Sequence, residues 1–193
     1  MALTIGISLL GLFRLPTIID KCLFRPYFFL RKKQYDTMIL SGFVHADVGH
    51  LLFNMFTFYF FAFPLERFIG TLPFLVLYFV GLIASHACTY FKHRNNESYA
   101  SLGASGAISA VLFAYIVYFP MTMLMIIPIP IPIPAVLFAV GYVGYSYWAS
   151  LQSRGRINHD AHLCGAVSGL GFVAAADPSA FGELLKAIGT FLS

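Results

Sequence analysis

Long apolar segments separated by short polar breaks constrain this chain more than any other feature. A helix that crosses a bilayer needs about 20 apolar residues, and segments close to that length recur along the whole sequence. Only 10% of the 193 residues are charged, whereas soluble domains carry about 25%. So few charges cannot cover a water-facing surface. We therefore expect an all-α polytopic membrane protein and exclude a soluble enzyme, a disordered chain and a nucleic-acid binder.

The apolar segments predict six spans within a single membrane domain, residues 1–193. The first span is the weakest, because Arg14 and Pro16 interrupt it, and a shortened, tilted or partly re-entrant helix stays open there. Four prolines alternate with isoleucines over 128–134, which excludes a helix and predicts an extended connector of polyproline type. The predicted spans are residues 2–20, 48–68, 72–91, 105–118, 135–151 and 160–176.

The three cysteines, Cys22, Cys88 and Cys164, lie in or beside apolar segments without a CxxC pattern. We interpret them as small buried hydrophobic residues. The net charge of +4 is typical of loop lysines and arginines near anionic lipid.

Two histidine pairs raise the question of a metal site. His45 lies near His50, and His159 lies near His162, but no carboxylate or cysteine completes a ligand set at convincing spacing. We therefore expect no metal and no other cofactor.

Polar side chains inside apolar segments are costly in hydrocarbon and often mark function. His50 and Asn54 are four residues apart, so they share one face of the second helix. Ser105 opens the fourth helix between Gly103 and Gly106, where a tight turn and free N–H groups suit a nucleophile whose attack creates an oxyanion. A polar pair that joins two helices and an N-cap serine are the ordinary interpretations.

His162 stands at the head of the sixth segment, followed by Gly165 and Gly169 in a GxxxG pattern. Small residues at this spacing let two membrane helices approach closely. Close approach would bring His162 within reach of a serine on a neighbouring helix. An interfacial histidine at a helix end is the alternative interpretation.

Together these motifs resemble the rhomboid family of intramembrane serine proteases, over residues 20 to 177. The sequence HADVGHLLFNM at 45–55 is similar to the family's pattern of two histidines followed by an asparagine. GASG at 103–106 resembles its nucleophile motif, and AHLCG at 161–165 resembles its general-base motif. Each motif is common by itself, but all of them in this order form a specific signal.

The resemblance implies a six-helix bundle with a water-filled cavity that opens to one side of the membrane. By analogy, Ser105 is the nucleophile and His162 its general base, a dyad without a carboxylate. His50 and Asn54 would donate hydrogen bonds to the oxyanion, together with the Ser105 N–H. Supporting positions are Gly103, Gly106, His45, Gly165 and Gly169.

The resemblance also implies that the partners are membrane lipids and single-span membrane proteins, cut in or beside their spanning segments. The fifth segment is the expected lateral gate. One departure concerns the base: some bacterial members carry an aromatic residue four positions after the nucleophile, packed on the histidine, where this chain has Ser109. His162 must therefore be held in another way.

Two other functions stay open. An inactive rhomboid-like protein that binds membrane clients is the first, although such proteins typically lose the serine or histidine kept here. A small transporter is the second, but it predicts broken helices at matching positions, and only one proline-rich connector is present.

The minimal six-helix form favours a bacterial inner membrane. The oligomeric state stays open, and so does the orientation. Nine cations lie in loops on the Ser105 side and two on the opposite side, which by the positive-inside rule points the site toward the cytoplasm. Bacterial members of the family open the site to the outside.

Overall fold

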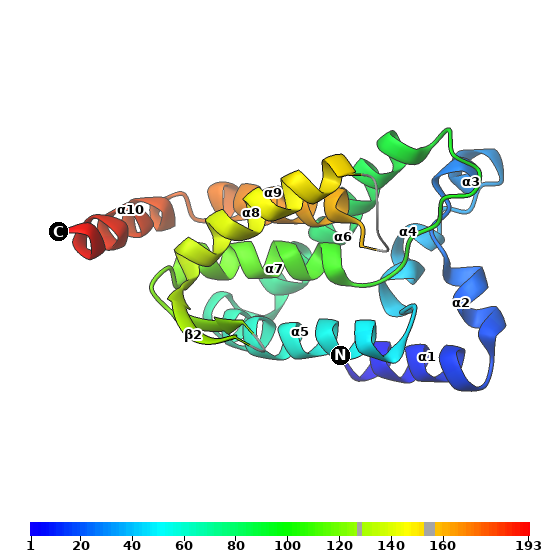
Figure 1. Cartoon of the computed structure of the whole chain (residues 1–193), viewed down its shortest axis with the longest axis horizontal. Coiled ribbons are helices and arrows are strands. Elements are labelled where there is room, and N and C mark those ends of the chain that lie inside the picture. Colours follow the sequence, from blue (N-terminus) through cyan, green and yellow to red (C-terminus); the bar gives the residue numbers. More distant parts are fainter. Residues whose placement is uncertain (127–128, 153–156) are drawn as a thin grey trace.

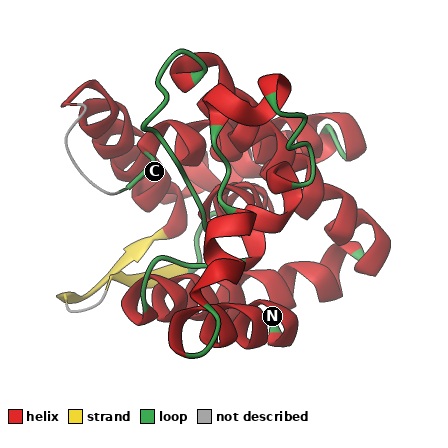
Figure 2. Ribbon diagram, turned by 90° about the vertical axis from the view of Figure 1, so that its right-hand side faces the viewer, coloured by secondary structure: helices red, strands yellow, loops and turns green. Residues whose placement is uncertain are grey.

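The computed structural model describes residues 1–126, 129–152 and 157–193 (Figure 1). Most of the chain is helical, with one short hairpin (Figure 2). In chain order the elements are α1 (Ala2–Phe13), α2 (Pro16–Cys22), α3 (Pro26–Arg31), α4 (Thr37–Leu40), the 3-10 helix η1 (Ser41–Phe43), α5 (Val48–Ile69), α6 (Thr71–His93), α7 (Ser105–Tyr118), β1 (Met123–Ile126), β2 (Ile129–Pro134), α8 (Ala135–Gln152), α9 (His159–Ala176) and α10 (Ser179–Leu192).

Helix α7 forms the centre of the bundle (Figure 1). Residues 106–117 of α7 are all buried, and the helix contacts α5, α6, α8, α9 and α10. A helix surrounded by other helices is apolar on every face, which explains why this segment has no polar stripe. Val111 and Ala114 of α7 pack with Leu65, Leu77 and Val173 in the core.

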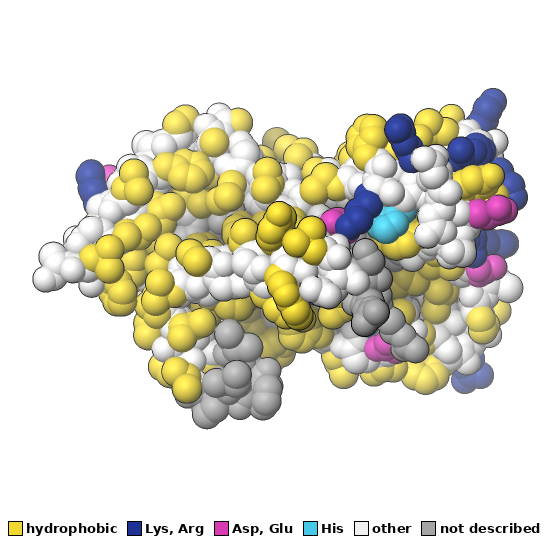
Figure 3. Space-filling model, turned by 45° about the horizontal axis from the view of Figure 1, so that its top comes forward, with side chains coloured by type: hydrophobic (Ala, Val, Ile, Leu, Met, Phe, Trp, Pro, Cys, Tyr) yellow, Lys and Arg dark blue, Asp and Glu magenta, His cyan; other side chains and the backbone are white. Residues whose placement is uncertain are grey.

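Among the described residues, two helices, α5 and α6, are long and apolar enough to cross a membrane. Counting each bent pair, α1 with α2 and α9 with α10, as a single span raises the number to four, and α7 is a shorter apolar helix. Apolar side chains cover much of the visible surface, while basic side chains gather at one end (Figure 3). The side chains of Phe53, Leu72, Val140 and Val167 are 67–73% exposed, as expected for contact with lipid.

The first apolar segment is broken rather than straight. Arg14 and Leu15 separate α1 from α2, and the chain bends by 119° between the two helices. Pro16 is the first residue of α2. The N–H group at this position has no partner within a helix, so the absence of an N–H in proline costs no hydrogen bond. The proline therefore starts a second helix instead of extending the first. At the other end of the chain, α10 turns 112° away from α9.

The proline-rich segment forms a strand, so the expectation of a polyproline-type connector is wrong over 129–134. Strand β2 pairs antiparallel with β1, with Leu124 opposite Ile133 and Met125 opposite Pro132 (Figure 2). Alternate residues of an edge strand direct their N–H groups away from the partner strand. Prolines at every second position therefore remain compatible with pairing. Pro128 lies outside the described residues.

A disulfide between Cys88 and Cys164 joins α6 to α9. The interpretation of the cysteines as buried hydrophobic residues is therefore wrong for these two. Their sequence separation of 76 residues gives no local pattern, so spacing alone could not pair them. Cys22 is the free cysteine of the described chain.

We expect removal of this disulfide to lower the thermal stability. Replacing both Cys88 and Cys164 by serine should cost about 2–4 kcal/mol, because the unfolded chain regains the freedom that the cross-link removes. The measurement is thermal unfolding of the purified protein, with Cys22→Ser as the matched control. A double variant that unfolds at the wild-type temperature would contradict the structural role of the bond.

Helix α9 packs on α7 through its small residues. A methyl group at Gly165 would overlap the backbone of Gly106, and one at Gly169 would overlap the backbone of Ala110. A methyl group at Gly106 would in turn overlap the side chain of Ser85 on α6. The close approach that the GxxxG pattern predicts is therefore confirmed.

Gly165→Ala should destabilise the protein by about 1–3 kcal/mol, because α7 and α9 must separate to admit the methyl group. Gly171→Ala is the matched control on the same helix, since a methyl group there meets no atom within 4 Å. Alanine is the better helix former by about 1 kcal/mol, so the control should be neutral or more stable. Thermal unfolding of both variants checks this, and equal stabilities would refute the close packing.

Candidate active site

Ser105 is the first residue of α7, and the loop before it is fixed by backbone hydrogen bonds. Phe24 and Ser101 exchange two, at 3.0 and 2.9 Å, and the Gly103 N–H donates to the Ser41 carbonyl at 2.9 Å. Gly103 has a φ of +111°, a conformation that favours glycine. The N-terminal third of the chain therefore holds the turn that presents Ser105.

His162 lies against Ser105, with its Nε2 atom 2.8 Å from the serine Oγ. The first turn of α9 is fixed by Asn158, whose side-chain carbonyl accepts from the Ala161 N–H at 3.1 Å. The amide of Asn158 donates to Thr89 Oγ1 on α6 at 2.8 Å. The start of α9 is thus anchored to α6. The distance from His162 Nε2 to the Ser105 hydroxyl lies in the range that proton transfer requires.

Asp160 is the carboxylate closest in sequence to His162, but it is engaged elsewhere. Lys92 Nζ, at the end of α6, donates to Asp160 Oδ2 at 2.7 Å and to the Ser150 carbonyl of α8 at 3.3 Å. This ion pair joins the ends of α6, α8 and α9. Asp160 therefore holds the helices together instead of orienting the imidazole of His162.

His50 lies beside the turn that presents Ser105. Its backbone N–H donates to Asp47 Oδ1 at 2.7 Å, which caps α5. A methyl group at Gly103 would come within 2.7 Å of His50 Cε1. Glycine at this position therefore gives the imidazole room next to the start of α7.

Asn54 lies one turn after His50 on α5 and is 3% exposed. Its Nδ2 donates to the His50 carbonyl at 2.9 Å, which uses one of the two N–H groups of the amide. Within the described residues, Nδ2 makes no second hydrogen bond. Among the described residues, Asn54 Oδ1 has no hydrogen-bond partner.

His45 is fully buried behind His50, with the two rings edge to face at 4.9 Å. Ser8 Oγ donates to the Phe43 carbonyl at 3.0 Å and lies 3.0 Å from His45 Nδ1, so the histidine donates to the serine. Burial, and then the neighbouring His50, lower the pKa of His45 to about 4. His45 is therefore a neutral packing partner of His50.

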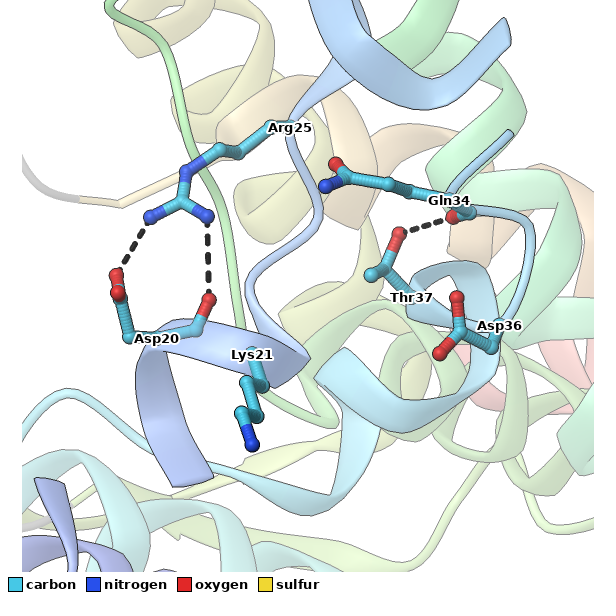
Figure 4. A pocket seen from close by; sticks show the side chains of 6 residues that line it. All are labelled: Asp20, Lys21, Arg25, Gln34, Asp36 and Thr37. Carbon is cyan, nitrogen blue, oxygen red and sulfur yellow. Dashed lines mark hydrogen bonds and ion pairs between the residues drawn. The ribbon is translucent and has the colours of Figure 1, made fainter. Parts of the chain in front are cut away.

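A separate cleft of about 360 Å³ lies in the N-terminal segment (Figure 4). Arg25 crosses part of it, donating to the Asp20 carboxylate at 2.6 Å and to the Asp20 carbonyl at 3.1 Å. No predicted site residue lines this cleft. Its lining residues are Asp20, Lys21, Arg25, Gln34, Asp36 and Thr37.

Comparison with known proteins identifies the family of this chain. Residues 32–176 match the family model of the rhomboid domain. This chain belongs to the rhomboid family. The match includes every residue that the sequence analysis places at the site.

Three curated relatives show the range of this similarity. RHOMBOID-like protein 12, mitochondrial, of Arabidopsis thaliana is 30% identical over 67% of this chain and 43% of its own length. Presenilin-associated rhomboid-like protein A, mitochondrial, of Danio rerio is 32% identical over 70% of this chain and 36% of its own. Rhomboid protein 1, mitochondrial, of Saccharomyces cerevisiae is 28% identical over 87% of this chain and 50% of its own length.

The chain thus spans half or less of the length of these relatives. Their mitochondrial names do not support the bacterial inner membrane expected from the sequence. The apolar helices and the match to the rhomboid domain support a membrane protein.

Sequence reasoning missed three residues around this rhomboid site: Asn158, Lys92 and Tyr142. Asn158 could have been found as an N-cap residue directly before an apolar segment. Tyr142 and Ser146 are four residues apart on α8 and face inward, and Ser146 is 1% exposed. A polar pair at this spacing on an otherwise apolar helix was the available signal.

Proposed function

We propose that this protein is an intramembrane serine protease that hydrolyses peptide bonds in or beside the spanning segments of membrane proteins. The observation that carries the proposal is the 2.8 Å distance between Ser105 Oγ and His162 Nε2. The membership in the rhomboid family supports it. Single-span membrane proteins are the proposed substrates, and lipids surround the bundle.

In the proposed reaction, Ser105 Oγ attacks the carbonyl carbon of the scissile bond while His162 Nε2 takes the hydroxyl proton. The carbonyl oxygen becomes an oxyanion, which accepts hydrogen bonds from the Ser105 N–H, the imidazole of His50 and the second N–H of Asn54. His162 then gives its proton to the leaving amine. A water molecule, activated by the same histidine, hydrolyses the acyl-enzyme.

The length of α7 supports a site below the membrane surface. Its 14 residues extend about 21 Å, whereas the hydrocarbon core is about 30 Å thick. With the far end of α7 at one interface, Ser105 lies inside the hydrocarbon region. We propose that helices at the six predicted segments cross the membrane, and that polar residues around Ser105 keep water at this depth.

A helical substrate hides its peptide bonds in internal hydrogen bonds, so it must unwind locally before Ser105 can attack. The glycines on either side of the serine favour a small residue before the scissile bond. A cleavage profile that prefers large residues at that position would refute this preference.

Cleavage of a single-span protein by the purified enzyme in liposomes tests the proposed function. We expect two fragments, with the cut placed by mass spectrometry in or beside the spanning segment, and no fragments with Ser105→Ala. If folded wild-type protein binds the same substrate but leaves it intact, the client-binding alternative replaces the protease.

A further inference from the structure

The ring of Tyr142, on α8, lies beside the imidazole of His162 and nearly parallel to it. The two ring centroids are 6.3 Å apart and the planes differ by 22°. The tyrosine ring also packs on Phe113 of α7 and Phe138 of α8, at centroid distances of 5.5 and 5.8 Å. Tyr142 therefore fills the space between three helices next to the dyad.

The hydroxyl of Tyr142 is held on α7. It lies 2.8 Å from Ser109 Oγ, and Ser109 is 3% exposed. Ser109 follows Ser105 by one helical turn, so both serines face the same side of α7. One serine thus contacts the imidazole, and the other holds the aromatic ring beside it.

His162 has few other groups to orient it. Its Nε2 faces Ser105, and within the described part of the chain no hydrogen bond reaches its Nδ1. Of the neighbouring rings, His159 belongs to the same helix as His162 and lies edge to face at 5.8 Å. An imidazole without an orienting acceptor needs packing to keep Nε2 directed at the hydroxyl.

We propose that Tyr142 is a positioning residue for the general base: its ring holds the imidazole of His162 toward Ser105, and its hydrogen bond to Ser109 holds the ring. This inference rests on the proposed protease function. It answers how His162 is fixed when the position four residues after the nucleophile carries a small side chain. Tyr142 touches neither the scissile bond nor the oxyanion in this role.

Steady-state cleavage of a single-span substrate in liposomes tests the inference, with kcat and KM measured separately. Tyr142→Leu should lower kcat by about 10–100-fold, since a misdirected base loses its reacting geometry. Its KM should stay within about twofold of the wild-type value, because the substitution removes no contact with the bound substrate. Tyr142→Phe keeps the ring and should lower kcat much less, by only about 2–3-fold, because it removes a single hydrogen bond.

The hydrogen bond is tested by a double-mutant cycle. Ser109→Ala should lower kcat by the same factor as Tyr142→Phe, and the double variant should lower it no further. Tyr59 is the matched control, since it is a tyrosine outside the expected gate, on α5, with a side chain that is 55% exposed. Tyr59→Phe and Tyr59→Leu should leave kcat unchanged.

Three outcomes overturn the inference. If wild type cleaves through Ser105 and Tyr142→Leu keeps full kcat, the inference alone fails. If the loss appears as a raised KM, the tyrosine contacts substrate instead of the base. If wild type does not cleave, the proposed function fails as well. Thermal unfolding identifies any variant that does not fold. If Tyr142→Leu does not fold, the kcat values of the conservative variants Tyr142→Phe and Ser109→Ala test the inference instead.

Discussion

Ser105→Ala and His162→Ala should each lower the rate of substrate cleavage by at least about 1000-fold. Without the hydroxyl no acyl-enzyme forms, and without the imidazole no group at 2.8 Å accepts the hydroxyl proton. Because the two residues act as a unit, the double variant should be no slower than either single variant. The measurement is the initial rate of fragment formation at saturating substrate.

The matched control is Ser168→Ala. Ser168 lies on α9, like His162, and within the described residues its hydroxyl donates only to the Gly165 carbonyl of its own helix, at 2.7 Å. It should keep the wild-type rate. If Ser105→Ala keeps more than about a tenth of the activity, the nucleophile lies elsewhere, because loss of a true nucleophile costs several orders of magnitude.

His50→Ala and Asn54→Ala should each lower kcat by about 100–1000-fold with little change in KM. Their N–H groups are expected to strengthen their hydrogen bonds only as negative charge develops on the carbonyl oxygen, so they stabilise the transition state more than the bound substrate. Asn54 retains one amide N–H for this purpose, because the other donates to the His50 carbonyl.

Thr57→Ala is the control for this pair. Thr57 lies on α5 and donates to the Phe53 carbonyl of the same helix at 2.9 Å, so its loss should leave kcat unchanged. A rise in KM at constant kcat for the His50 or Asn54 variants would assign these residues to substrate binding. Stabilisation of the oxyanion would then have to come from other groups.

The sequence predicted the structure best where it has long apolar runs or polar side chains at the helical period. The apolar segments at 48–68, 72–91 and 105–118 correspond closely to α5, α6 and α7, because long apolar runs carry a strong signal. His50 and Asn54 share a face of α5 for the same reason. The GxxxG pattern indicated that His162 lies near a serine of a neighbouring helix, and the family resemblance specified Ser105, which is 57 residues away in sequence.

Apart from the close approach at the GxxxG pattern, three features that depend on tertiary contact could not be predicted. The disulfide joins residues on two helices whose proximity follows from packing at Gly165 and Gly106. The pairing of β2 with β1 could not be predicted, because proline has no N–H to donate to a strand ladder and therefore argues against a strand. Tyr142 reaches His162 from a different helix than the family pattern indicates, so no local spacing points to it.

Covalent labelling of Ser105 by a fluorophosphonate probe tests the central claim most directly. The purified protein is treated with the probe beside Ser105→Ala and His162→Ala, and the modified residue is located by mass spectrometry. The proposed dyad predicts one adduct, on Ser105, in wild type and none in either variant. Labelling that persists in Ser105→Ala, or a folded wild type that remains unlabelled, would contradict a histidine-activated serine at this site.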